Sequence, residues 1–118
     1  MSGIVFFRTA QEDRVVEFYR ERVGADVWLD QDGCTILARD GFKFGFCERD
    51  ETDDCGILTF YYEDRTEVDE TYDRLRDVAR DPPVENDQYE VYQFFAEDPD
   101  GRTVEFQTFL HPLPDESA

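Results

Sequence analysis

The most constraining feature of this sequence is an order of predicted elements that occurs twice within 118 residues. Shifting the sequence by 53 residues places Ile4 on Ile57, and shifting it by 60 places Phe46 on Phe106. Identity between the copies is thin, but each copy gives the same order of one strand, one helix and three strands. Such a repeat indicates one supersecondary unit used twice. We therefore predict a single domain, residues 1–118, made of two repeats at about 3–50 and 55–110.

The first repeat opens with β-branched and aromatic residues, which favour a strand. The spacing of Thr9 and Glu12 is that of a capping box and predicts the start of a helix, which Gly24 is expected to end. Asp-Gly pairs at 32–33 and 40–41 predict two hairpin turns. The strands of this repeat are predicted at residues 3–8, 26–30, 35–39 and 42–47.

The second repeat gives the same signals. The spacing of Asp64 and Glu67 predicts another capped helix, and the proline pair at 82–83 is expected to end it. The sequence at 98–101 is typical of a turn before the last strand, and residues 111–118 are predicted to form a flexible tail. The helix is expected to carry an apolar stripe of Val68, Tyr72, Leu75 and Val78, with strands at 56–62, near 84, at 91–97 and at 102–110.

Charge excludes one class of function. Thirty Asp and Glu residues face twelve Lys and Arg residues, a formal net charge of −18, and Lys43 is the only lysine. A nucleic-acid-binding protein needs a basic patch, so nucleic acid is not an expected partner. Two interpretations remain: a halophilic surface adapted to a salt-rich cytoplasm, or an acidic pocket for a cationic ligand. The acidic residues are spread along the whole chain, which favours the salt-adapted surface.

We expect salt to stabilise this protein. Repulsion among unpaired carboxylates extends over a Debye length of about 30 Å in 0.01 M salt and only about 3 Å in 1 M salt. The melting temperature should therefore be higher in the concentrated salt. A melting temperature that stays constant or falls between these two conditions would contradict the salt-adapted interpretation.

Composition also bears on whether the chain folds and on its cellular location. Aromatic residues make up 15% of the chain, which favours a folded domain over a disordered acidic one. No apolar stretch is long enough to cross a membrane and the start of the sequence does not resemble a leader, so we expect a cytoplasmic protein without a membrane partner. Cys34, Cys47 and Cys55 form neither a CxxC pair nor a visible disulfide framework, and are interpreted as reduced, mostly buried thiols.

Two stretches of the sequence resemble a known family. The segment RVVEFYRERVG at 14–24 is similar to the first helix of the vicinal oxygen chelate superfamily, and EDPDGRTVEF at 97–106 is similar to its last hairpin. That superfamily includes glyoxalase I, extradiol dioxygenases, methylmalonyl-CoA epimerase and the bleomycin-resistance proteins. The resemblance implies an α+β fold of two βαβββ units, whose mixed sheets curl into half-barrels around a cup. It also implies a homodimer.

In metal-dependent members of this superfamily, the first and last strand of each unit supply one metal ligand each. The corresponding positions here hold Ile4, Gly45, Ile57 and Glu105, so only one of the four can bind a metal. Adding Cys47, which shares a strand face with Gly45, still leaves too few ligands. His111 lies beyond the last strand and is interpreted as a surface residue of the tail. We therefore predict that the protein has neither a metal nor another cofactor.

Strand alternation predicts which residues line the cup. Glu105 could act there as a base or bind a ligand's amine, or it could be a structural partner of Arg8 or Lys43. Arg8 could instead bind a ligand's anionic group, while Tyr61 is more typical of packing than of acid catalysis. The predicted ligand-binding residues are Phe6, Arg8, Lys43, Cys47, Thr59, Tyr61, Glu105 and Gln107.

The favoured function is a metal-free protein of the glyoxalase/bleomycin-resistance type that holds a small amphipathic or aromatic molecule in its cup. One alternative is a glyoxalase- or dioxygenase-like enzyme that uses Glu105 as a base or binds a divalent metal through atypical ligands. Another is a structural or regulatory module whose cup is filled by its own side chains. Fold alone does not decide between these alternatives.

Overall fold

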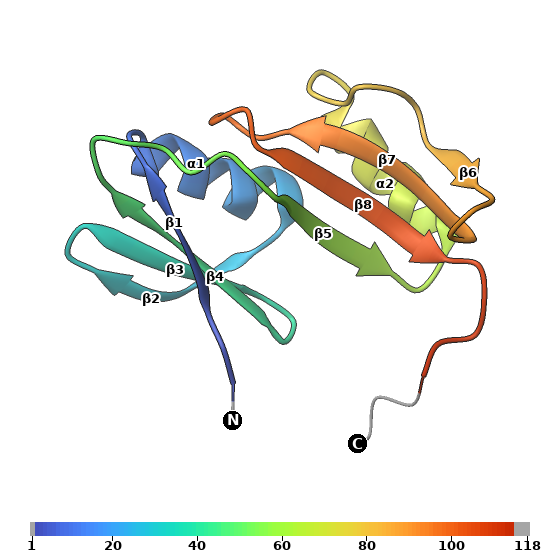
Figure 1. Cartoon of the computed structure of the whole chain (residues 1–118), viewed down its shortest axis with the longest axis horizontal. Helices are drawn as coiled ribbons and strands as arrows, with labels where there is room; N and C mark the ends of the chain where they lie inside the picture. Colours follow the sequence, from blue (N-terminus) through green and yellow to red (C-terminus); the bar gives the residue numbers. More distant parts are fainter. Residues whose placement is uncertain (1, 115–118) are drawn as a thin grey trace. The chain divides into compact units, whose positions relative to one another are not determined.

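The computed structural model describes residues 2–114, so the part of the predicted tail at 115–118 lies outside the described residues. The backbone divides into two compact units, and each has a four-stranded mixed sheet with a helix on one face (Figure 1). Of the described residues, the first unit contains 2–55 and the turn at 98–102, and the second contains 56–97 and 103–114. The predicted α+β fold of two βαβββ units is confirmed.

The first unit follows the predicted order of elements. Its strand order is β1-β4-β3-β2, with β1 parallel to β4 and the other pairs antiparallel. The elements are β1 (Val5–Thr9), α1 (Glu12–Phe18), the π-helical turn η1 (Tyr19–Val23), β2 (Asp26–Gln31), β3 (Cys34–Arg39) and β4 (Phe42–Glu48).

The second unit repeats this arrangement in the order β5-β8-β7-β6, with β5 parallel to β8. No helix among the described residues is both long and apolar enough to span a bilayer. The elements are β5 (Ile57–Tyr62), α2 (Arg65–Leu75), β6 (Val84–Asn86), β7 (Val91–Glu97) and β8 (Thr103–Phe109).

Strand register repeats between the units. Phe6 pairs with Gly45 in the first sheet, and Thr59 pairs with Glu105 in the second. The shifts of 53 and 60 residues that relate the repeats in sequence convert the first pair into the second. Side chains at these paired positions therefore occupy equivalent places in the two units.

Each unit has its core between the helix and the sheet. In the first unit, Tyr19 is fully buried and its ring lies 5.2 Å from Phe44 and 5.3 Å from Phe46, measured between ring centroids. In the second unit, Phe94 and Phe106 stack at 5.0 Å beneath α2, and both are buried. Burial of these large rings supplies the main driving force for folding each unit.

The helix boundaries differ in part from those predicted. Asp64 caps α2 as expected, because its carboxylate accepts the backbone N–H of Glu67 at 3.0 Å. The capping box predicted at 9–12 is wrong: Thr9 lies in β1, its hydroxyl accepts the backbone N–H of Gln11, and Gln11 is the residue before α1.

Only one of the two helical segments ends at its predicted stop signal. Gly24 ends the helical segment of the first unit in the left-handed conformation, with a φ of 90°, as its sequence predicted. Helix α2 ends at Leu75 and not at the proline pair, because the backbone N–H groups of Val78 and Ala79 turn back to the Leu75 carbonyl. Ala79 then forms a bridge with Ala96 of β7. Val78, the last residue of the predicted apolar stripe, therefore lies beyond the helix.

Candidate functional site

Each sheet has a face turned away from its helix, and these two faces carry the predicted ligand-binding residues. On β4, Phe44 and Phe46 contact Tyr19 of the helical segment, so the alternate residues belong to the opposite face. Face A, in the first unit, contains Phe6, Arg8, Cys34, Ile36, Lys43, Gly45 and Cys47. Face B, in the second unit, contains Ile57, Thr59, Tyr61, Gln93, Phe95, Glu105 and Gln107.

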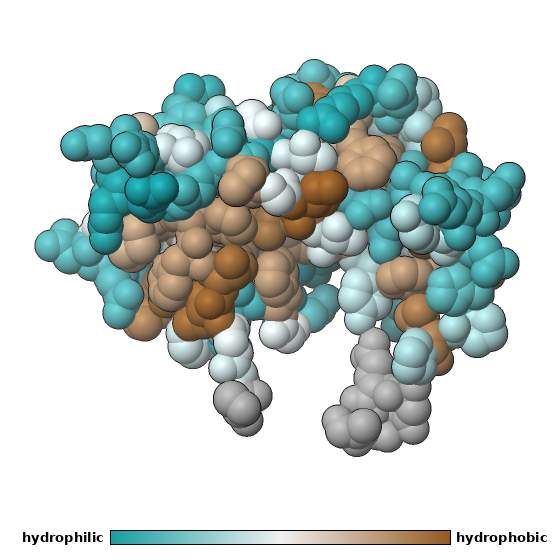
Figure 2. Space-filling view, viewed as in Figure 1, coloured by the Kyte–Doolittle hydropathy of each residue, from teal (hydrophilic) through white to brown (hydrophobic). Residues whose placement is uncertain are grey.

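Figure 2 shows apolar side chains gathered over strands of the first unit and bordered by hydrophilic residues. Phe6 is half exposed, at 50%, and its neighbour Val5 in β1 is exposed as well. Trp28 and Leu29 on β2 are similarly exposed, at 53% and 43%. Exposed large apolar residues close together indicate a surface that contacts another molecule.

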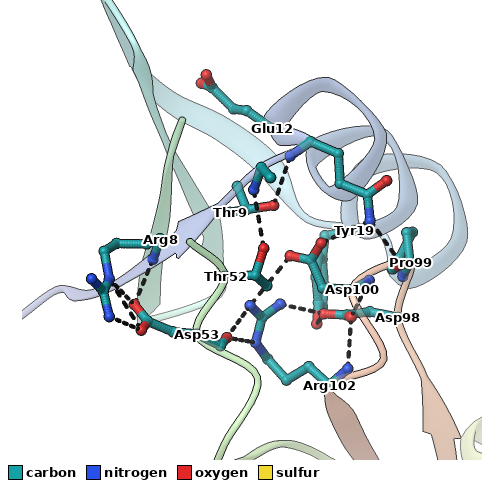
Figure 3. Close-up of polar contacts among 12 residues, drawn as sticks. Arg8, Thr9, Glu12, Tyr19, Thr52, Asp53, Asp98, Pro99, Asp100 and Arg102 are labelled. Carbon is teal, nitrogen blue, oxygen red and sulfur yellow. Dashed lines mark hydrogen bonds and ion pairs between the residues drawn. The ribbon is translucent and has the colours of Figure 1, made fainter. Parts of the chain in front are cut away.

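Arg8 is held by carboxylates of its own unit. Its guanidinium donates to both Asp53 carboxylate oxygens, the shortest contact being 2.7 Å (Figure 3). It also donates to Glu51 at 3.0 Å. Hydrogen bonds from the Arg8 side chain and backbone lower the pKa of Asp53 to about 2. Arg8 is therefore held within the first unit, where it fixes the segment that follows β4.

Lys43 contacts an aromatic ring of its own unit. Its ammonium lies 5.1 Å from the ring centroid of Trp28, a cation–π contact. Trp28 reaches this face because the pairing of β2 with β3 shifts between Val27 and Leu29. Sequence reasoning missed Trp28, since simple alternation assigns it to the face opposite Leu29.

Cys34 and Cys47 form a disulfide, so the predicted reduced thiols are wrong for these two residues. They face each other across β3 and β4, with their Cα atoms 4.0 Å apart. Cys55 is free and exposed, which also contradicts the predicted burial. On face A, Cys47 is therefore a structural residue rather than a thiol that could contact a ligand.

Face B joins the other predicted residues. The Thr59 hydroxyl donates to Glu105 at 2.9 Å, which orients a partly buried carboxylate. Tyr61 is 54% exposed and its ring contacts Phe109, in line with the packing role predicted for it. Gln107 is buried and pairs with Gln93 across β7 and β8, in the row equivalent to the disulfide of the first unit.

Several solved structures have a backbone similar to that of this chain. The chain is similar to a glyoxalase/bleomycin resistance protein/dioxygenase from Nocardioides, with 15% identity, a TM-score of 0.75, and coverage of 100% of this chain and 89% of that one. It is also similar to a glyoxalase-related enzyme from Fulvimarina pelagi, with 14% identity, a TM-score of 0.79, and coverage of 100% and 95%. A lactoylglutathione lyase from Agrobacterium tumefaciens gives 19% identity, a TM-score of 0.75, and coverage of 92% of both chains.

This chain has the glyoxalase/bleomycin-resistance/dioxygenase fold. The resemblance to the vicinal oxygen chelate superfamily is thus confirmed at the level of the fold. No protein-family model and no curated protein matches the sequence. Since the identities are 14–19%, these similarities establish architecture and leave the activity to be argued from the residues.

Gly45 and Glu105 are two of the positions at which the family resemblance implies metal ligands. A Cβ atom at Gly45 would lie 2.8 Å from two carbons of the Phe6 ring, so Phe6 occupies the space that a ligating side chain needs. Throughout residues 2–114, no three His, Cys, Asp or Glu side chains are grouped as a metal site requires. At the Gly45 position, therefore, the side chains present offer no ligand to a divalent metal.

One polar cluster was not predicted at all. Arg102, which follows the turn at 98–101, is fully buried in the first unit, and its guanidinium binds the Asp98 carboxylate at 2.5 Å. Asp98 also accepts the Tyr19 hydroxyl at 2.6 Å, and Arg102 donates to the backbone carbonyl of Asp53 (Figure 3). The guanidinium lies 4.7 Å from the centroid of the Phe7 ring.

Electrostatics within this cluster are strongly coupled. Burial raises the pKa of Tyr19, and the adjacent Asp98 carboxylate raises it further, so the hydroxyl stays protonated and donates. Burial alone would lower the pKa of Arg102, but the charge of Asp98 outweighs it and keeps the guanidinium ionised. The polar groups of the cluster bind one another, and the role of the cluster is to attach the 98–102 turn to the rest of the first unit.

Proposed function

We propose that this protein binds a small amphipathic or aromatic molecule without using a metal. The observation that carries the proposal is the contact of Phe6 with Gly45. At the position where face B has the Glu105 carboxylate, face A has a glycine covered by an aromatic ring. An apolar surface has replaced a potential metal ligand, which suits the binding of an organic molecule better than Lewis-acid chemistry.

The polar groups of the two faces support the same proposal. Most predicted polar residues already have partners: Arg8 binds Asp53, and Glu105 accepts from Thr59. A few fixed polar groups beside apolar side chains can orient a ligand, whereas catalysis requires a group that can exchange protons with it. We further propose a cytoplasmic homodimer, on the basis of the family resemblance.

A catalytic alternative rests on Glu105. The Thr59 hydroxyl holds this carboxylate in one orientation, as a general base would need. Under this alternative, Glu105→Gln would abolish turnover while preserving the shape of the side chain. Under the binding proposal, the same variant would only change affinity.

The test combines metal content with ligand binding. Protein purified without chelator should contain far less than stoichiometric Zn, Fe, Mn or Ni by elemental analysis. Small aromatic and amphipathic molecules should raise its melting temperature, because a ligand that binds only the folded state stabilises that state. Adding a chelator should leave these shifts unchanged.

Variants of Glu105 provide the decisive comparison. Stoichiometric metal that disappears in Glu105→Ala, but remains in Glu70→Ala, would overturn the proposal and favour the enzyme. Glu70 is a matched control because it is an exposed glutamate of α2, the helix on the opposite side of the sheet from face B. A screen in which no compound shifts the melting temperature would favour a structural module.

A further inference from the structure

Lys43 is an unusual cation in this protein. The chain has 30 acidic residues, yet within the described part of the first unit Lys43 forms no ion pair with a carboxylate. Its ammonium instead lies 5.1 Å from the Trp28 ring centroid. Several arginines, including Arg8, Arg65 and Arg102, do bind carboxylates. The only lysine is therefore kept next to an aromatic ring with its charge still available to an anion.

A β-bulge creates this contact. Val27 pairs with Leu37 and Leu29 pairs with Ile36, so Trp28 is an extra residue in β2. Bulges redirect side chains at the cost of a regular ladder and are often found next to binding sites. Here the bulge places the indole on face A with Leu29, where Lys43 can reach it.

The strand between them leaves room for Lys43 to cross. Ala38 of β3 pairs with Lys43 on one side and with Asp26 on the other. The small side chain of Ala38 leaves the space above β3 open to the lysine chain. Asp26 is the acidic residue at the outer end of this row, and it is exposed to solvent, where water screens its charge.

We propose that Trp28 and Lys43 form a subsite for the carboxylate end of a small planar aromatic anion. The ligand's ring contacts the exposed indole surface, and its carboxylate binds the Lys43 ammonium. Phe6 and Leu29, both exposed, extend the apolar surface on the same face. This inference rests on the proposed ligand-binding function and adds the chemical class of the ligand.

Charge makes the proposed selectivity unusual. A chain with a net charge of −18 repels anions in general, so a preference for an aromatic carboxylate over its neutral analogue requires a local cation. The charge-assisted contact with Lys43 should strengthen binding of the anion about tenfold. A neutral aromatic molecule should gain only the contact with the indole and its apolar neighbours.

Trp28 provides a direct readout because it is the only tryptophan. Its indole N–H gives a single side-chain signal of its kind in a proton–nitrogen NMR spectrum. Titration of the full chain with naphthoate should move this signal, and calorimetry at constant ionic strength should give the dissociation constant. The neutral isostere naphthamide should bind more weakly.

Variants distinguish local binding of the anion by Lys43 from the long-range electrostatic effect of the protein's net charge. In Lys43→Gln, the dissociation constant of naphthoate should rise about tenfold, while that of naphthamide stays unchanged. Arg49→Gln removes the same charge from an exposed residue beyond β4 and should change neither. Trp28→Leu should weaken binding of both probes.

Three results would overturn this inference. One is naphthoate binding that leaves the Trp28 signal unmoved, and another is equal weakening by Lys43→Gln and Arg49→Gln. The third is absence of naphthoate binding to the wild type. None of these results decides the proposed function, which depends on the separate melting-temperature screen and metal analysis.

Discussion

Replacing Arg102 with methionine is expected to lower the free energy of unfolding by about 3 kcal/mol, because removal of one partner leaves a buried charge without its counterion. Asp98 would remain buried in Arg102→Met, with the Tyr19 hydroxyl and backbone N–H groups as its remaining donors. These donors keep the expected loss toward the lower end of the range for broken buried pairs. Chemical denaturation of the variant and the wild type measures the difference.

Arg76→Met is the matched control for this prediction. Arg76 binds Asp73 at 2.6 Å, nearly the distance between Arg102 and Asp98, but both side chains are about two-thirds exposed. Its loss should cost at most about 1 kcal/mol. The double variant Asp98→Asn with Arg102→Met should be less destabilised than the sum of the single changes, because the unpaired charge is gone. Equal costs for Arg102→Met and Arg76→Met would show that burial does not strengthen this pair.

Loss of the disulfide is expected to be the other large effect. Cys34 and Cys47 are 13 residues apart, and opening a closed loop of that length should lower the free energy of unfolding by about 3 kcal/mol in the chain-entropy description. The double variant Cys34→Ser with Cys47→Ser should therefore melt at a lower temperature than the wild type. Reductant should lower the melting temperature of the wild type only.

Cys55→Ser is the control, because Cys55 is exposed and lies outside the disulfide. Alkylation of the denatured chain should label Cys55 alone before reduction and all three cysteines after it. Labelling of three thiols without reductant would show that the cross-link does not form. The result bears on the predicted cytoplasmic location, since reducing compartments seldom preserve structural disulfides.

Much of the fold could be predicted because its signals are local. Period-two and helical patterns, Asp-Gly turns and Gly24 each act over a few residues, and their order repeats along the chain. Alternation also assigned all eight predicted ligand-binding residues to the sheet faces opposite the helices. This succeeded because β1, β4, β5 and β8 pair without an irregularity.

The errors have physical causes that pattern reading does not capture. Trp28 was missed because a bulge interrupts alternation in β2. Arg102 was missed because an arginine after a turn ordinarily faces solvent, and its acceptor Asp53 lies far away in sequence. Tyr19, which donates to Asp98 in the same cluster, is equally distant. The sequence did contain a signal for the disulfide. A two-residue turn at 40–41 places residue 34 opposite residue 47 in the hairpin. Comparing the cysteine positions with this strand register would have predicted the pair.

The placement of the 98–102 turn has a consequence for biosynthesis. The first unit contains residues 2–55, but its buried Arg102 is made only after most of the second unit has been translated. The amino-terminal half therefore emerges from the ribosome with Tyr19 lacking its Asp98 acceptor. The first unit therefore completes its buried polar contacts only after the 98–102 turn has been made.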